Sequence, residues 1–245
     1  MNNIFGNQST EGMSGEQDRL GSGGVLESGI YDGIIKAAYA GKAQNSQAMS
    51  VTINAQLTLP SGSTFDYRET IWVTNRTNEN FYVDKKDATK KHLLPGFLMV
   101  DSICLMSTGQ GLTDQDMEEK VFNIYDFDQK AEVPKSVPTL VDLIGKPITL
   151  AILKQIVDKN VKQADGSYKP GGETREENVI DKAFHTDSKR TTSEVRAGLE
   201  DALFYSQWDA KNTGKTRNRA KGGEGKTGSP ANSNAASRTK TSLFS

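Results

Sequence analysis

The chain has 245 residues, of which 35% are hydrophobic and 25% are charged. This composition is typical of a soluble protein with one large domain or two small ones, diluted by polar segments. No stretch approaches the roughly 18 apolar residues of a membrane span, and the first residues lack the pattern of a secretory signal. We therefore expect a cytosolic protein.

The formal net charge is −1, but the positive and negative charges are unevenly distributed along the chain. Residues 211–245 hold eight Lys or Arg and one acid, Glu224, a net charge of +7, whereas the remaining residues have a net charge of −8. A basic tail on an acidic body favours contact with a polyanion, although a solvated tail needs no ligand. The only cysteine, Cys104, lies in an apolar stretch, which predicts a buried thiol.

The first half of the chain predicts a β-meander. Residues 1–24, rich in Gly, Ser, Asn and Gln, predict a flexible arm, and residues 29–39 predict a strand. Apolar and polar residues then alternate over 49–59, as in a strand with one solvent-exposed face, and again over 64–74 after a turn. In the second strand the two faces are Phe65, Tyr67, Ile71 and Val73, against Arg68, Thr70, Trp72 and Thr74.

The second half mixes strands and helices. Helical spacing follows Pro95-Gly96 and ends at Gly109. Further strands are expected at 121–127 and 146–161, with a short helical turn at 139–144 between them. A polar loop over 166–177 and a last strand over 178–185 follow.

A capping box formed by Thr191 and Glu194 opens the last predicted element, an amphipathic helix that runs to Trp208. No periodicity survives beyond Asn212. The predicted organisation is a β-rich fold with a few helices: an arm over 1–24, a body over 25–210 and a basic, disordered tail over 211–245.

Catalytic motifs are absent from the sequence. It contains no G-x-x-x-x-G-K-[ST], H-E-x-x-H, G-x-S-x-G or C-x-x-C, and His92 and His185 have no Cys or His at ligand spacing. Acidic runs such as 114–119 are typical of solvated faces or caps. We expect a non-catalytic protein without metal or cofactor, and keep a metal-dependent nuclease built on these acids as an alternative.

Aromatic and basic residues interleave on the polar face of the predicted meander and in the connection after it. An exposed aromatic ring can stack on an unpaired base for roughly 1–3 kcal/mol, while Lys and Arg hold phosphates and release counterions. Two explanations without a ligand remain. Trp72 could be a core residue covered by the helix over 195–208, and the lysines could lie in a solvent-exposed loop. Tyr82 is preferred over its neighbour Phe81 because its hydroxyl tolerates water. The expected binding residues are Arg68, Trp72, Arg76, Tyr82, Lys85, Lys86, Lys90 and Lys91.

Two further basic regions are candidates. Residues 159–175 predict a mobile loop able to clamp a single strand, although an ordinary hairpin loop explains them equally well. Residues near the start of the tail could add nonspecific phosphate contacts. The candidates are Lys159, Lys162, Tyr168, Lys169 and Arg175 in the loop, and Lys215, Arg217, Arg219 and Lys221 in the tail.

Five segments together resemble bacteriophage-encoded single-stranded DNA-binding proteins: Asn3–Asn7, Ser28–Gly33, Tyr67–Asn75, Gly172–Asn178 and Lys215–Lys221. The resemblance extends over most of residues 1–221. It implies an OB-like barrel with long loops that coats single-stranded DNA in the cytoplasm of the infected bacterial host, in DNA replication, recombination and repair. No catalytic residues follow from it.

The end of the chain departs from bacterial proteins of this function, which usually end in an acidic stretch with a hydrophobic tip that recruits replication enzymes. Here Leu243 and Phe244 supply the tip, but the acids are missing. Recruitment of replication or recombination proteins by the tail therefore stays open. The alternative function is an interaction or scaffold protein whose basic tail docks on an acidic partner; the sequence leaves the oligomeric state undetermined.

Overall fold

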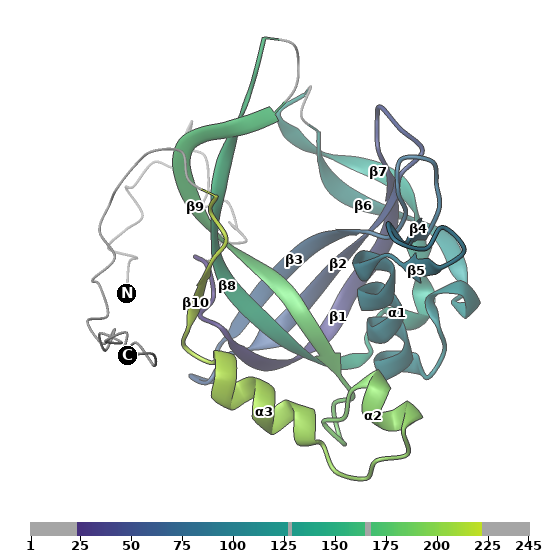
Figure 1. The fold of residues 1–245 in the computed structure, drawn as a ribbon, viewed down its shortest axis with the longest axis vertical. Coiled ribbons are helices and arrows are strands. Elements are labelled where there is room, and N and C mark those ends of the chain that lie inside the picture. Colours follow the sequence, from purple (N-terminus) through teal and green to yellow (C-terminus); the bar gives the residue numbers. More distant parts are fainter. Residues whose placement is uncertain (1–23, 127–128, 165–167, 222–245) are drawn as a thin grey trace, which may run out of the picture. The chain divides into compact units, whose positions relative to one another are not determined.

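The computed structural model describes residues 24–126, 129–164 and 168–221, and its fold is β-rich. The chain divides into two compact units. The first combines residues 1–154 with 178–216, and the second combines 155–177 with 217–245. Figure 1 follows the elements along the chain.

An antiparallel meander of three strands organises the first unit. It consists of β1 (Gly29–Lys42), β2 (Met49–Thr58) and β3 (Thr64–Trp72). The register places Tyr39 opposite Thr52, and Thr52 opposite Thr70. Both predicted alternating strands are therefore confirmed.

The strand β1 has different partners along its other edge. Its first part pairs with β8 (Pro147–Lys162), and its later part meets β7 (Ala131–Leu140) at Tyr39. A register shift between Ile35 and Ala37 marks a bulge, which bends the strand where the partner changes. The meander and these partners consequently form one curved sheet.

The barrel that this sheet begins is not closed by a backbone ladder. The strand β9 (Tyr168–Phe184) pairs with β8, and no described backbone pairing joins it to β3. A side chain spans the two strands instead. The Glu69 carboxylate on β3 accepts hydrogen bonds from the backbone N–H of Ile180 on β9 and from the Tyr67 hydroxyl, both at 2.7 Å.

The helix α1 (Pro95–Thr108) packs against the core side of β3. Its Val100, Ile103 and Cys104 side chains are fully buried in the core formed by the inner faces of the strands. Burial, with a smaller contribution from nearby Asp101, raises the pKa of the Cys104 thiol to about 12. The predicted buried thiol and the predicted helix are confirmed.

Two hairpins differ from the sequence-based expectation. The strands β6 (Met117–Asp126) and β7 form a ten-residue ribbon, of which the sequence predicted only part of β6. Pro134 and Pro138 interrupt the strand pattern of β7, and this edge ribbon tolerates them. The lysine-rich connection contains the short hairpin of β4 (Phe81–Val83) and β5 (Lys91–Leu93). The single turns η1 (Leu112–Asp114) and η2 (Val141–Leu143) flank the ribbon, the latter as predicted.

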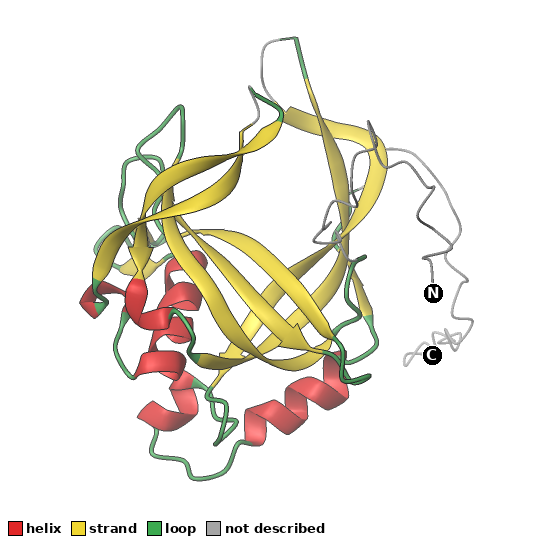
Figure 2. Cartoon of the chain, turned by 180° about the vertical axis from the view of Figure 1, so that it is seen from behind, coloured by secondary structure: helices red, strands yellow, loops and turns green. Residues whose placement is uncertain are grey.

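The predicted C-terminal helix is two helices, α2 (Thr192–Arg196) and α3 (Leu203–Asn212), and Gly198, with φ of 67°, lies between them. The predicted capping box is present, and the Glu194 carboxylate also accepts from the Phe204 backbone N–H at 2.7 Å. Burial alone would raise the pKa of Glu194, but the hydrogen bonds from Thr191 and Phe204 outweigh it and lower the pKa. Figure 2 shows the helices on one side of the strands of this unit.

The second unit contains residues 155–162 of β8 and 168–177 of β9. The expected loop over 166–177 is wrong for most of its length, because β9 is extended from Tyr168 onward. The expected tail boundary at 211 is wrong as well. The helix α3 continues to Asn212 and β10 (Thr216–Asn218) pairs with β8, and the backbone N–H of Arg219 donates to the Ile156 carbonyl at 2.8 Å.

The predicted arm over 1–24 lies outside the described residues except for Gly24, and so does the tail beyond Lys221. Of the helices that the structure describes, none is long and apolar enough to span a membrane.

The contact between α1 and β3 generates a test. A Cβ added at Gly96 would lie 2.0 Å from the Trp72 carbonyl oxygen and 3.1 Å from Ile71 Cγ2. Backbone atoms cannot yield as a flexible side chain can, so Gly96→Ala should lower the free energy of unfolding by about 2 kcal/mol in urea. The matched control is Gly24→Ala, whose added Cβ would have nothing within 4 Å. Equal stability of the two variants would contradict the described packing.

Candidate nucleic-acid interface

The outer face of β3 carries an exposed tryptophan. Tyr67 and Ile71 point into the core, with exposed fractions of 4% and 8%, whereas Trp72 is 49% exposed and Arg68, four residues earlier on the same face, is exposed as well. The helix α1 covers only the core side of this strand. The alternative in which the C-terminal helices bury Trp72 is therefore wrong.

Trp72 borders a hollow of about 300 Å³. The start of β2 and the loop before it lie against the chain after β3: the Met49 N–H donates to Thr74 Oγ1 at 2.7 Å and the Gln47 N–H to the Arg76 carbonyl at 3.1 Å. No acidic side chain lines the hollow, and Arg76 is exposed at its margin. A ring face beside a guanidinium group can hold a base and its phosphate. The lining residues are Ala43, Ser46, Ala48, Trp72, Thr74, Asn75 and Arg76.

A larger groove, of about 510 Å³, lies beside Arg68. The Arg68 Nη2 donates to the Tyr39 hydroxyl at 2.8 Å, and the Tyr39 ring stacks on Phe122 of β6, with ring centroids 5.3 Å apart. The β6–β7 ribbon thus forms one wall, and the outer face of the meander forms the floor. The lining residues are Lys36, Asn54, Ala55, Asp66, Tyr67, Arg68, Asn123 and Glu132.

Sequence reasoning missed most of this groove. Lys36 lies in a predicted strand without any pattern that would single it out. Asn123 and Glu132 reach the groove only because β6 pairs with β7, and the sequence did not predict β7.

The β4–β5 hairpin exposes the aromatic residue that was preferred. Tyr82 is 49% exposed and lies 5.3 Å from the His92 ring, measured between centroids. Its neighbour Phe81 is half-buried, with Lys91 Nζ 4.2 Å from its ring centroid. Tyr82 is therefore the more exposed ring of this hairpin.

The lysines of this hairpin fall into two groups. Lys90 forms an ion pair with Asp87 at 3.2 Å, whereas Lys85 and Lys86 are exposed and have no ion pair among the described residues. Hydrogen bonds from the Lys86 backbone and from His92 lower the pKa of Asp84, which shapes the turn between the strands. The predicted lysine cluster therefore lies on a turn that the hydrogen bonds of Asp84 hold in place.

The predicted clamp residues are in the second unit. Tyr168 is 66% exposed, and Lys162 and Lys169 are exposed as well. Two other cations already have partners: Lys159 pairs with Glu173 at 2.8 Å and Arg175 with Glu177 at 2.9 Å. A phosphate would have to compete with these acids.

The predicted tail contacts lie in the described part of the chain and are exposed. Lys215 belongs to the first unit, and its Nζ donates to the Lys211 carbonyl. Arg217, Arg219 and Lys221 belong to the second unit, where the Lys221 backbone N–H donates to Asp158 Oδ2 at 3.0 Å. All four side chains therefore project from structured backbone.

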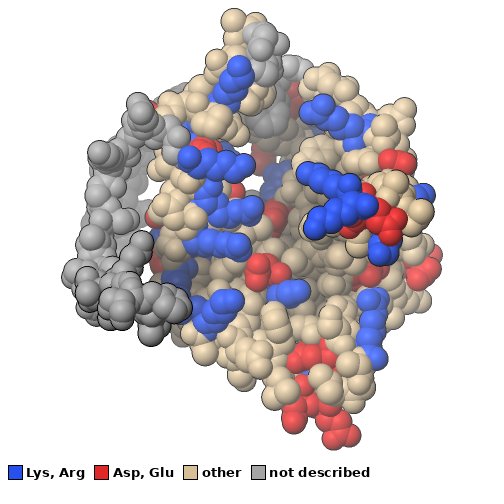
Figure 3. All heavy atoms as spheres, in the orientation of Figure 1, with Lys and Arg blue, Asp and Glu red and all other residues tan. Residues whose placement is uncertain are grey.

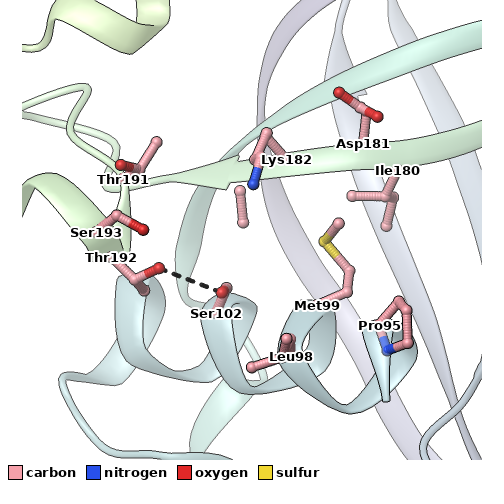
Figure 4. Close-up of a pocket in the computed structure, with 11 residues that line it drawn as sticks. Pro95, Leu98, Met99, Ser102, Ile180, Asp181, Lys182, Thr191, Thr192 and Ser193 are labelled. Atoms are coloured by element: carbon pink, nitrogen blue, oxygen red, sulfur yellow. Dashed lines mark hydrogen bonds between the residues drawn. The ribbon is translucent and has the colours of Figure 1, made fainter. Parts of the chain in front are cut away.

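A separate hollow of about 390 Å³ lies between α1, β9 and the start of α2 (Figure 4). Ile180 and Lys182 point toward α1, while Asp181 points to the other side of β9 and accepts from the Trp208 indole N–H at 2.7 Å. The hydroxyls of Ser102 and Thr192 lie 3.3 Å apart. The hydroxyl contact joins α1 to α2, and Lys182 is the one cation among the described residues that line this hollow.

Charge on the visible surface is mixed. Figure 3 shows Lys and Arg side chains distributed over it with Asp and Glu side chains between them. Within residues 24–126, 129–164 and 168–221, no group of His, Cys, Asp and Glu is placed to hold a metal ion. No family model, curated protein or solved structure matches this chain.

Solvent access to the two tryptophans can be measured without a ligand. Trp72 is 49% exposed and Trp208 only 3%, so acrylamide should quench one component of the fluorescence strongly and the other weakly. Trp72→Phe should remove the quenchable component, and Trp208→Phe should leave it. A protein whose two tryptophans are equally protected would contradict the exposed face of β3.

Proposed function

We propose that this chain is a non-catalytic single-stranded DNA-binding protein that binds largely without sequence dependence and acts in phage DNA replication, recombination and repair. The observation that supports this most is Trp72: a half-exposed indole beside Arg76, in a hollow lined by no acid. An exposed tryptophan on a strand presents an apolar ring face on which a ligand can stack. Unpaired bases are ligands that such a ring binds well.

The strand arrangement supports an OB-like barrel. Around the barrel the order is β3, β2, β1, β8 and β9, and the Glu69 bridge to Ile180 brings β9 next to β3. An OB-fold is a five-stranded, partly open Greek-key barrel that binds oligonucleotides on the face of its second and third strands. In this chain that face is the outer face of β2 and β3, which carries Arg68 and Trp72.

The proposed mechanism is electrostatic capture followed by stacking. Arg68, Arg76, Lys85 and Lys86 are exposed and have no ion pair among the described residues, so they can neutralise phosphates and release counterions. Bases then stack on Trp72 and Tyr82. Because every base has a π-face, this step is nearly independent of sequence.

The remaining predicted contacts extend the same mechanism. In the second unit Tyr168 offers another exposed ring, with Lys162 and Lys169 as cations. Exposed basic side chains from Lys215 to Lys221 would add phosphate contacts. We place this activity in the cytoplasm of the infected bacterial host, with replication or recombination proteins as further partners through the tail.

A titration with oligo-dT tests the proposal. In a Trp208→Phe background the fluorescence reports Trp72 alone, and it should be quenched on binding. Trp72→Ala should weaken binding by about 5- to 150-fold, which corresponds to about 1–3 kcal/mol of lost stacking. Affinity should fall steeply between 50 and 200 mM salt because several phosphate contacts release counterions.

Arginine variants provide the matched comparison. Arg68→Ala and Arg76→Ala should weaken binding and reduce the salt dependence, whereas Arg196→Ala, an exposed arginine on α2, should not. Unchanged Trp72 fluorescence with saturating oligo-dT would favour the interaction or scaffold protein instead. Metal-dependent cleavage of the oligonucleotide would favour the nuclease.

A further inference from the structure

The groove beside Arg68 differs chemically from the Trp72 hollow. Two cations, Lys36 and Arg68, share it with two acids, Asp66 and Glu132. Its volume of about 510 Å³ is within the range of about 300–1,000 Å³ typical of small-ligand sites. The Trp72 hollow has no acid at all. The two sites should therefore hold different parts of one ligand.

The charged groups of the groove have unused binding capacity. Among the described residues, Lys36 and Glu132 have no ion pair, and the only hydrogen bond to the Asp66 carboxylate is a long one, 3.4 Å, from Gln56 Nε2. The Asn54 Oδ1 is buried without any hydrogen-bond partner. Such groups in a groove favour a ligand that donates and accepts hydrogen bonds.

The acids determine which part of a nucleotide fits. A phosphate placed here would meet the carboxylates of Asp66 and Glu132, and like charges at short range repel. The edge of a base has no net charge and presents donors and acceptors together. Carboxylates accept from the exocyclic amino group of cytosine, amides bind adenine, and arginine donates to base acceptors. Thymine has no exocyclic amino group.

The position of the groove fits a strand that already stacks on Trp72. Arg68 is four residues from Trp72 on the same face of β3, which corresponds to about 13 Å along an extended strand. The Tyr39 hydroxyl holds the Arg68 guanidinium at the groove. One oligonucleotide can therefore reach both sites.

We infer that this groove receives the edge of a nucleobase and favours a base with an exocyclic amino group over thymine. This inference rests on the proposed function and adds a compositional preference to it. Lys36 donates to the ring acceptors of the base, Asp66 and Glu132 accept from its amino group, and Arg68 binds the phosphate next to that base. The stacking sites and the phosphate contacts remain insensitive to sequence.

The test compares oligo-dC with oligo-dT of equal length at one salt concentration. Both are pyrimidine strands, so they differ chiefly in the base edge. The intact chain should bind oligo-dC at least about fivefold more tightly. In the double variant Asp66→Ala, Glu132→Ala the ratio should fall to about one, and affinity for oligo-dT should stay the same or increase because two negative charges are gone.

Two controls separate the explanations. Asp187→Ala removes an exposed acid outside the groove and should leave the ratio as it is. Asp66→Asn with Glu132→Gln keeps the side-chain shape, should retain folding, and should also reduce the ratio. The inference is overturned if the intact chain binds oligo-dC and oligo-dT equally tightly. It is also overturned if both double variants keep the preference of the intact chain for oligo-dC. If oligo-dT still binds through Trp72 in that case, the proposed function stands without it.

Discussion

The contact between α1 and β3 determines which surface the protein presents. The helix begins directly on the backbone of β3, where a glycine at 96 is required because the Trp72 carbonyl leaves no space for a side chain. Val100, Ile103 and Cys104 then fill the core beneath the strand. Because side chains of a strand alternate between its faces, the helix that buries Ile71 leaves Trp72 outside.

The exposed surface divides into chemically distinct parts. The Trp72 hollow combines a ring with Arg76 and lacks acids, so it suits a stacked base and a phosphate. The neighbouring groove mixes acids, amides and cations and is the site that we infer receives a base edge. The β6–β7 ribbon makes the second site by bringing Phe122 onto Tyr39. A side-chain bridge from Glu69 holds β9 to the edge of the meander without a backbone ladder.

Sequence patterns predicted correctly the strands and helix starts that depend on interactions between residues close in the chain. The alternation over 64–74 placed Arg68 and Trp72 on one face, and the pair Thr191 and Glu194 marked a helix start. The sequence failed where distant segments meet. The β7 strand was hidden by its prolines, and without it the groove could not be foreseen, since Asn123 and Glu132 come together only through strand pairing. Residues 168–177 of the predicted loop and 216–218 of the predicted tail are strands because β8 gives them a partner.

The most direct measurement of the central claim uses the two indole N–H signals in a ¹⁵N–¹H spectrum. Trp72 is half-exposed on the outer face of β3, while the Trp208 indole is buried and donates to Asp181 at 2.7 Å, so it serves as an internal reference. On addition of oligo-dT the Trp72 signal should shift or broaden strongly and the Trp208 signal should remain in place. A Trp72 signal that does not move while the oligonucleotide binds would contradict the account.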